Sequence, residues 1–291
     1  MDITLVILYS IAFLALLIAS YTDLKTREVP DWLNYSIIFA GVGLRLMFSV
    51  YYNNYSYIIE GLIGLALFVA ISLLMFYAGQ WGGGDSKMLM GLGALFGISL
   101  DYNSFAIYFF INLLLAGSIY GLLFSIYLTI KYWTSFKKEL RNFRQYFHKG
   151  YHYLTLLILI VSIVVYFSLH DIYLKMLILS WVILLLILNT LLIFIKMVEK
   201  ACMLKLVNPK ILTEGDWIAK EVKYKGKIIA SPKDLGVSKQ QINFLTRLYK
   251  QKKINKVVLK VGIPFIPSFL IGFIVTILFG NLLAYLISSL T

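Results

Sequence analysis

Two aspartates stand beside breaks in otherwise apolar sequence: Asp23 in "SYTDLKTREVPDWLN" and Asp85 in "QWGGGDSKMLMGLG". Two carboxyl groups at close range resist joint ionisation, so one retains a proton while the other remains a base. Such a pair can polarise a carbonyl group and deprotonate a water molecule in one site. Because 62 positions separate the two aspartates, this chemistry requires a fold that brings them together.

Three consecutive glycines, Gly82, Gly83 and Gly84, come directly before Asp85. Glycine has no side chain, so the backbone can leave helical geometry and a substrate chain can approach closely. Non-helical backbone at membrane depth persists only where protein or water satisfies its polar groups, so we expect a small aqueous cavity beside Asp85. Taken singly, Asp85 is also explained as a helix N-cap, and Asp23 as a polar residue flanking a helix.

The composition is that of an integral membrane protein. Of the 291 residues, 60% are hydrophobic and only 14% are charged, which leaves too little polar surface for a soluble domain of this length. A bilayer core requires about 20 apolar residues per helix. Eight stretches are predicted to span: 3–21, 33–52, 57–79, 87–100, 105–130, 151–169, 173–195 and 263–288. The fourth of these is short for a full span.

Positive charges indicate the orientation of these spans. The segments 22–32, 80–87, 131–150 and 196–262 hold 25 of the 27 Lys and Arg residues. By the positive-inside rule these segments are cytoplasmic, and both termini lie outside. Both aspartates are then predicted at the cytoplasmic face of the cell membrane. The net charge of +13 follows from this topology, suggests contact with anionic lipids of the bilayer, and does not indicate nucleic-acid binding.

The fold class predicted is an all-α polytopic membrane protein of about eight transmembrane helices with a small cytoplasmic α+β subdomain. Residues 1–130 form the transmembrane core with both aspartates, and residues 131–195 form an interfacial basic helix plus two further spans. Residues 196–262 form the subdomain, and residues 263–291 the last span. The subdomain is expected to contain a hairpin in "WIAKEVKYKGKIIA", a capped helix in "SKQQINFLTRLYKQ" and a strand in "INKVVLKV".

Two other features of the sequence bear on the site. Cys202 is the one cysteine, which excludes an intrachain disulfide and a multi-cysteine zinc module, and we expect no metal and no cofactor. Arg45 and Glu60 fall in the outer halves of adjacent spans, where a charged side chain is costly unless paired. We therefore predict that these two residues pair with each other.

The motifs resemble those of the type IV prepilin peptidases, including their archaeal preflagellin branch. "GGGDSKMLMGLGALFG" is similar to the G-x-G-D-x-K signature of that family, and "DLKTREVPDWLN" resembles its first catalytic stretch. "GIPFIPSFLIGF" resembles the Pro-Phe-x-Pro start of its last helix. The resemblance is specific in residues 20–97, weaker in residues 200–285 and not evident in residues 131–196. Asp31 stands where Asn is usual, and Val29 where Ile is common.

The resemblance implies an aspartic endopeptidase of the G-x-G-D type in which Asp23 and Asp85 are catalytic, without a metal or a covalent intermediate. Gly82, Gly84 and Lys87 match positions that shape the site. Gly83 continues the glycine run, and Arg27 and Pro30 belong to the first stretch, so all of these residues are candidate site residues. The implied substrates are pilin or archaellin precursors, cleaved at the cytoplasmic membrane face.

Such precursors carry a short basic leader before an apolar helix. Acidic side chains suited to receive the leader are Glu28, Asp31, Glu214 and Asp216. Bacterial members often carry a four-cysteine zinc loop linked to N-methylation. Since this chain has a single cysteine, the resemblance favours the archaeal branch and cleavage without N-methyltransferase activity.

Two other classes of protein share some of these features. A proton-coupled transporter also has intramembrane acids and glycine breaks, but inverted repeats, which would support it, are not evident in the sequence. A non-catalytic scaffold for filament assembly would tolerate Asp23→Asn and Asp85→Asn, whereas a protease would not. The oligomeric state is not predicted.

Overall fold

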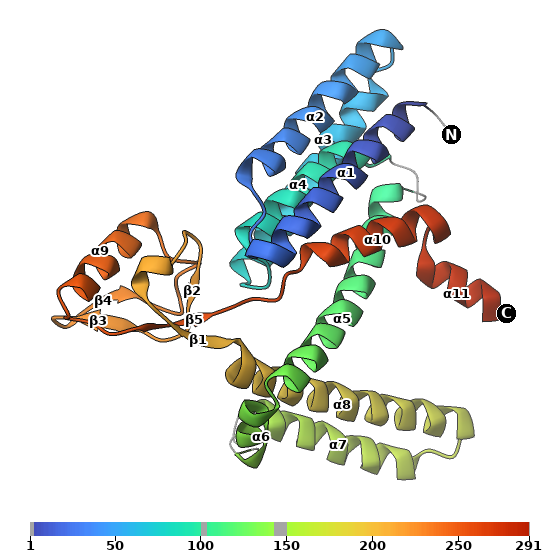
Figure 1. Cartoon of the computed structure of the whole chain (residues 1–291). Helices are drawn as coiled ribbons and strands as arrows, with labels where there is room; N and C mark the ends of the chain where they lie inside the picture. The colour runs from blue at the N-terminus through green and yellow to red at the C-terminus, as the bar shows by residue number, and fades with distance from the viewer. Residues whose placement is uncertain (1–2, 100–103, 143–149, 291) are drawn as a thin grey trace. The chain divides into compact units, whose positions relative to one another are not determined.

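The computed structural model describes residues 3–99, 104–142 and 150–290, and these are mostly helical (Figure 1). The helices are α1 (Ile3–Thr26), α2 (Asp31–Tyr51), α3 (Ser56–Tyr77), α4 (Gly83–Phe96), α5 (Phe105–Lys131), α6 (Trp133–Arg141), α7 (Gly150–Ser168), α8 (Ile172–Val198), α9 (Lys239–Lys250), α10 (Ile266–Phe279) and α11 (Leu282–Leu290). The strands are β1 (Leu204–Val207), β2 (Trp217–Ile218), β3 (Val222–Tyr224), β4 (Lys227–Ala230) and β5 (Val257–Lys260). A π-helical turn covers Glu199–Met203 and a 3₁₀ turn covers Pro209–Ile211.

The chain forms two compact units, 1–123 with 207–291, and 124–206. Within the described residues, five helical runs are long and apolar enough to cross a membrane: α1, α2, α3, α5 and the run that contains α8. A sixth is present if α10 and α11 form one bent span. The protein is therefore a multi-pass membrane protein. All eight predicted stretches contain helix, but α4, with 14 residues, and the apolar part of α7, Thr155–Ser168, are short for a full span, so the structure does not confirm a count of eight.

Two of the predicted boundaries differ from the observed helices. The predicted single helix 263–288 is instead α10 and α11, which meet at an angle of 48°. Gly280 has φ +62° at this break, a conformation that glycine adopts readily and that ends an α-helix. The predicted segment 87–100 is instead α4, which begins at Gly83 and ends before Gly97, where φ is +64°.

Helix α4 lies at the centre of the first unit. Almost all of its residues from Ser86 to Phe96 are buried, and it packs against α2 and α3, beside which it runs in Figure 1. Glycines make this close approach possible, because Gly91 faces Ile37 of α2 and Gly93 faces Phe68 of α3. Small residues at helix interfaces are the usual means of tight packing in membranes.

The segment between β1 and α10 contains the small sheets and α9. Strand β2 pairs antiparallel with β5, with Trp217 opposite Lys260. Strands β3 and β4 form the predicted hairpin, whose turn residues Lys225 and Gly226 both have positive φ, as a two-residue hairpin turn requires. The predicted capping box of α9 is also present, since Ser238 N donates to Gln241 Oε1 at 2.8 Å. An apolar core that includes Ile218, Leu245 and Val257 holds these elements together.

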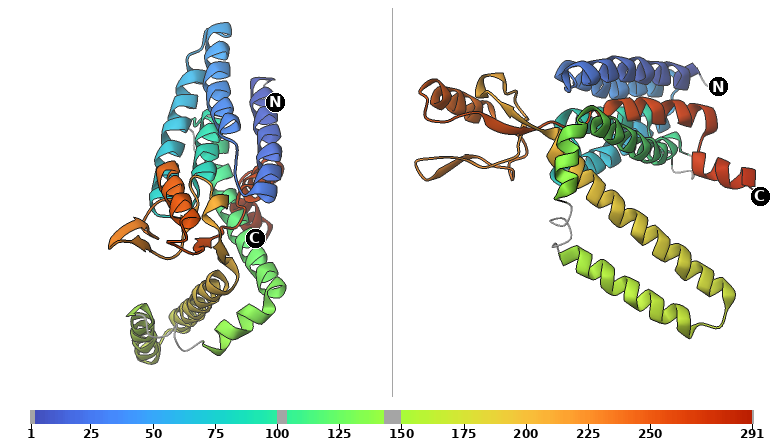
Figure 2. Two further views of the ribbon diagram at one scale, coloured as in Figure 1. Left: turned by 60° about the vertical axis from the view of Figure 1, so that its left-hand side comes forward. Right: turned by 60° about the horizontal axis from the view of Figure 1, so that its bottom comes forward.

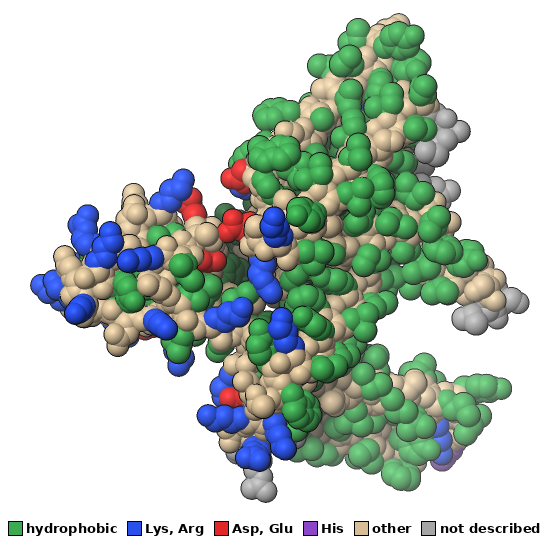
Figure 3. All heavy atoms as spheres, viewed as in Figure 1, with side chains coloured by type: hydrophobic (Ala, Val, Ile, Leu, Met, Phe, Trp, Pro, Cys, Tyr) green, Lys and Arg blue, Asp and Glu red, His purple; other side chains and the backbone are tan. Residues whose placement is uncertain are grey.

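In the second unit, α7 and α8 run antiparallel side by side (Figures 1 and 2). Most apolar side chains of α8 are exposed, as expected for a helix pair that faces lipid. Helix α6 is amphipathic, with Phe136 buried and three cations on its surface. It covers the first part of the predicted interfacial helix 131–150, whose residues 143–149 lie outside the described part. Figure 3 shows hydrophobic side chains over the helices and Lys and Arg gathered over the small-sheet segment.

Candidate active site

Asp23 lies in the last turn of α1 and is 4% exposed. Its Oδ2 atom accepts a hydrogen bond of 2.9 Å from the backbone N–H of Ile266, the first residue of α10. The N-terminus of a helix carries unsatisfied N–H groups and a partial positive charge, so a carboxyl group is well placed there. The contact joins segments 243 residues apart and fixes the side chain of Asp23.

Asp85 lies in the first turn of α4, and its Oδ2 atom accepts a hydrogen bond of 3.1 Å from Gly82 N. Gly82, with φ −71° and ψ 166°, is the N-cap of this helix. Asp85 therefore is not the N-cap itself, one of the explanations that the sequence left open. Its carboxyl group instead folds back onto the N-cap backbone, as the third helical residue does in a capping box.

The structure brings these two aspartates together. The carboxyl group of Asp23 is near enough to that of Asp85 for the two to interact electrostatically. Arg27 and Tyr120 of α5 also interact electrostatically with Asp23. One carboxyl group is thus held at the end of α1 and the other at the start of α4, each fixed by a backbone N–H.

Arg27 links the end of α1 to the segment that leads into α10. Its backbone N–H donates to Asp23 O at 2.8 Å, and its φ of +61° ends the helix. Its guanidinium group donates through Nη1 to the carbonyl oxygen of Gly262. Together with the bond between Asp23 and Ile266, this contact ties α1 to the start of α10 at two points.

The glycine run plays a narrower role than the sequence suggests. Gly82 alone is extended, whereas Gly83 and Gly84 are already helical. A Cβ atom at Gly84 would lie 3.3 Å from Val29 Cβ, so the third glycine permits close approach of the loop between α1 and α2. At Gly83 nothing lies closer than 4.0 Å to such an atom. The break from helical geometry is therefore confined to Gly82 and the turn before it.

Lys87 and Pro30 both make contacts at the start of α2. Lys87 Nζ is 2.6 Å from Asp31 Oδ1 and lies over the ring of Tyr35. Pro30 is the N-cap of α2, and its carbonyl oxygen accepts from Leu33 N at 3.1 Å. Lys87 thus links the start of α4 to the start of α2, whereas Pro30 only caps α2, and neither reaches Asp23 through a hydrogen bond within the described residues.

Sequence reasoning missed two contributions to the site. The first is the N–H of Ile266, which no residue type reveals, although the Pro-Phe-x-Pro resemblance pointed to this segment. The second is Trp81, buried in the turn before α4 with its ring 5.9 Å from that of Phe265 and 5.6 Å from that of Phe269. This aromatic contact packs the glycine turn against the first turns of α10.

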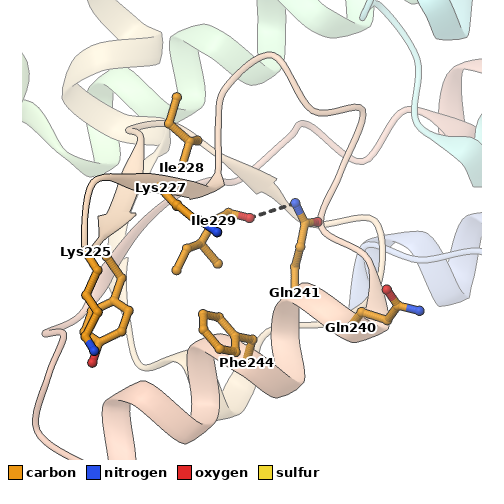
Figure 4. A pocket seen from close by; sticks show the side chains of 8 residues that line it. Lys225, Lys227, Ile228, Ile229, Gln240, Gln241 and Phe244 are labelled. Carbon is orange, nitrogen blue, oxygen red and sulfur yellow. Dashed lines mark hydrogen bonds between the residues drawn. The ribbon is translucent and has the colours of Figure 1, made fainter.

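A separate pocket of about 540 Å³ lies between the β3–β4 hairpin and α9. Figure 4 shows Ile229 and Phe244 facing it, with Lys225 and Lys227 nearby and a hydrogen bond of 2.9 Å from Gln241 to Ile229 O. Neither aspartate lines it. Within the described residues, no group of three or more His, Cys, Asp or Glu side chains is placed to hold a metal ion.

The helices that carry both aspartates are similar in sequence to a known protein family. Residues 10–126 match the sequence model of the type IV leader peptidase family, and this range includes Asp23, the glycine run and Asp85. The matched range covers less than half of the chain, so it shows that residues 10–126 are similar to the type IV leader peptidase family. No solved structure matches the chain.

Relatives from three archaea are similar to part of the chain. The preflagellin peptidase of Methanococcus maripaludis is 38% identical over 87 residues, which is 30% of this chain and 37% of the relative. That of Methanocaldococcus jannaschii is 36% identical over 87 residues, with the same shares. That of Methanococcus voltae is 39% identical over 89 residues, or 31% of this chain and 38% of the relative. The aligned part thus spans less than two fifths of each relative.

Proposed function

We propose that this protein is a membrane-embedded aspartic endopeptidase that removes the short basic leader from archaellin or type IV pilin-like precursors. The observation that carries the proposal is the approach of Asp23 and Asp85, each held by a backbone N–H at a helix end. The preflagellin peptidases to which the chain is similar support the choice of substrate.

The mechanism follows from the two carboxyl groups. One aspartate, protonated, polarises the scissile carbonyl group, while the other takes a proton from water, which attacks the carbonyl carbon. The first aspartate gives its proton to the carbonyl oxygen as the tetrahedral intermediate forms. When the C–N bond breaks, the second aspartate gives the proton that it took from water to the leaving amine, and the first regains its proton from the hydroxyl group that becomes the new carbonyl oxygen. These steps need no covalent intermediate and no metal. Because Cys202 is the single cysteine, the chain cannot form the four-cysteine loop linked to N-methylation, so we infer cleavage without N-methylation.

The topology that we propose has eight spans, with both termini outside and the aspartates at the cytoplasmic face. Its parts are the four predicted from the sequence, 1–130, 131–195, 196–262 and 263–291. Helices α4 and α7 would then cross as short helices enclosed by, or paired with, longer ones. Labelling of single cysteines introduced at 54 and 225 in intact cells tests this orientation, because only the first position is predicted to react with an impermeant reagent.

Two of the four acidic side chains considered for the leader are already paired. Asp31 is bound to Lys87, and Glu214 lies 3.4 Å from Lys239. Asp216 and Glu28 are instead near enough for their negative charges to repel. Burial raises the pKa of Asp216, and the charge of Glu28 raises it further, against the hydrogen bond from Thr213 N. A basic leader between these two carboxylates would relieve the repulsion.

We therefore expect Asp216→Asn to raise the KM for a precursor about fivefold, or ~1 kcal/mol, with little change in kcat. Because the pKa of Asp216 is raised, its charge is lost at a higher pH than for an ordinary carboxyl group, so the wild-type KM rises as pH falls. Steady-state kinetics on a precursor peptide measure both effects. Asp234→Asn is the control, since Asp234 makes the same kind of turn bond, from Ser231 N. An equal KM for Asp216→Asn and wild type excludes this role.

Arg27→Gly tests the link between α1 and α10. Glycine accepts the positive φ of this position without strain, but it loses the bond to Gly262. We expect kcat to fall about 10- to 100-fold, because a small displacement of a catalytic group has effects of this size. Arg27→Ala loses the same bond and also strains the backbone, so its melting temperature is expected to be the lower of the two. Wild-type kcat in the glycine variant would show that the link does not position Asp23.

The rival classes are separated by one experiment. Co-expression of the chain with an archaellin precursor is expected to yield the shortened product on a gel, and the product is expected to disappear with Asp85→Asn. A scaffold leaves the precursor intact, whether the wild-type chain or Asp85→Asn is co-expressed. A transporter also leaves the precursor intact. It instead gives proton-dependent uptake of a solute into vesicles, and this uptake is expected to be lost in Asp85→Asn.

A further inference from the structure

Three polar side chains are buried between α2, α3 and α4 without a hydrogen-bond partner in the described residues. They are Asn34, which is 0% exposed, Ser72, which is 0% exposed, and Ser86, which is 4% exposed. Both polar atoms of the Asn34 amide and the Oγ atoms of the two serines are unsatisfied by protein. Ser86 directly follows Asp85 in the chain, so this polar group lies beside the proposed catalytic pair.

Helix geometry places Asn34 opposite Ser72. Helices α2 and α3 are antiparallel, and Arg45 of α2 packs against Gly61 of α3. Asn34 lies eleven residues before Arg45, and Ser72 lies eleven residues after Gly61. Eleven residues are about three helical turns, so the same displacement along each helix returns to the same face at the same level.

Ser86 reaches this level from α4. Phe68 of α3 packs against Gly93 of α4. Ser72 lies one turn beyond Phe68, and Ser86 lies two turns before Gly93 on the same face of α4. The contact of Ile37 with Gly91 likewise brings Asn34, one turn before Ile37, to the start of α4. The three side chains therefore converge on one interface, about one turn from Asp85.

Polar groups buried without partners are costly, and more so inside a helix bundle that is itself enclosed by lipid. Replacing them by apolar residues of similar shape removes that cost, so their presence calls for a ligand. A single amide and two hydroxyl groups offer the three or four hydrogen bonds that a buried water molecule makes. A charged ligand does not suit the site, because none of these three side chains is ionised.

We propose that Asn34, Ser72 and Ser86 form an internal water-binding site that fixes the first turn of α4 and thereby positions Asp85. The three are positioning residues, since none touches the substrate in this account. The kinetic part of the proposal rests on the proposed peptidase function, whereas the water-binding part does not.

Ser72→Ala and Asn34→Leu, alone and combined, test the positioning role in the full-length chain in lipid nanodiscs. We expect kcat on a precursor peptide to fall about tenfold or more, KM to stay within about twofold, and the double variant to lose no more than the worse single variant. The melting temperature is expected not to rise. A kcat near that of wild type, or a higher melting temperature, overturns the proposal. Buried polar side chains with no bound water would give that result, because their replacement by apolar residues removes an unsatisfied group.

Ser49→Ala is the matched control, because Ser49 lies on the same buried face at the other end of α2 but accepts a hydrogen bond from Ile58 N at 3.0 Å. It is expected to lower the melting temperature while kcat stays near that of wild type.

Water binding is measured without any cleavage assay. In a chain labelled with ¹⁵N at asparagine side chains, the Asn34 amide signal, assigned by its loss in Asn34→Leu, is expected to show magnetisation transfer from water. No transfer at that signal overturns the water site even if the chain cleaves precursors. If magnetisation transfer is seen at the Asn34 amide but the chain cleaves no precursor, the water site stands and the peptidase function is wrong.

Discussion

Asp85→Asn and Asp23→Asn are each expected to lower kcat for precursor cleavage by at least about 10³-fold, because each removes one half of a proton-transfer pair. The asparagine carbonyl oxygen can still accept from Gly82 N or Ile266 N, so both variants are expected to fold. Since the two groups act as a unit, the double variant should be no worse than either single one. Product formation by the purified variants, followed by mass spectrometry, measures the loss.

Asp171→Asn is the matched control for both aspartates. Asp171 is the N-cap of α8 and accepts hydrogen bonds from Tyr173 N and Leu174 N, so its replacement changes a carboxyl group at a helix end outside the proposed site. Its kcat is expected to stay within about twofold of wild type. Residual cleavage above about one tenth of wild type in either site variant would contradict acid–base catalysis by that aspartate.

Arg45→Met is expected to lower the free energy of unfolding by about 3–5 kcal/mol. Arg45 is 1% exposed, and its guanidinium donates to Leu95 O at 2.9 Å and to Phe96 O at 2.5 Å. These carbonyl groups end α4 and have no helical partner. Nε also donates to Leu95 O, Nη1 donates to Tyr57 O, and the predicted ion pair with Glu60 is confirmed at 3.7 Å. Methionine fills the space but leaves all of these groups unsatisfied.

Thermal unfolding in one detergent measures this effect. Arg45→Lys should fall between the wild type and Arg45→Met, because lysine keeps the charge beside Glu60 but cannot reach several carbonyl groups at once. Arg141→Met, at an exposed position of α6, is expected to change stability by less than about 0.5 kcal/mol. A loss below about 1 kcal/mol for Arg45→Met would contradict a structural role for this buried cation.

Local features of the fold could be predicted from the sequence where one physical property decides them. Apolar runs of sufficient length predicted where helices form, and Lys-Gly in an alternating segment predicted the hairpin. The bend between α10 and α11 could not be predicted, because a glycine in an apolar run is tolerated in a straight helix as well as in a break. Membrane orientation rests on charge alone and stays a prediction.

The acidic residues of the site could be predicted from the sequence, but the backbone groups that hold them in place could not. Acidic residues at the ends of apolar runs are rare enough to single out Asp23 and Asp85. The N–H of Ile266 and the carbonyl of Gly262 are backbone groups, which carry no sequence signal. Likewise, the sequence predicted a partner for Arg45 but not its role at the end of α4. Such contacts depend on how segments far apart in the chain meet.

Whether residues 23 and 85 share one site can be measured without substrate. In a chain with Cys202→Ser, cysteines at both positions are predicted to be joined by a short bifunctional thiol reagent, with the two flanking peptides recovered as one species by mass spectrometry. Each single-cysteine chain should take up the reagent without forming that species. If both positions react with the reagent and the linked peptides never form, the two side chains do not meet, and the proposed catalytic pair is wrong.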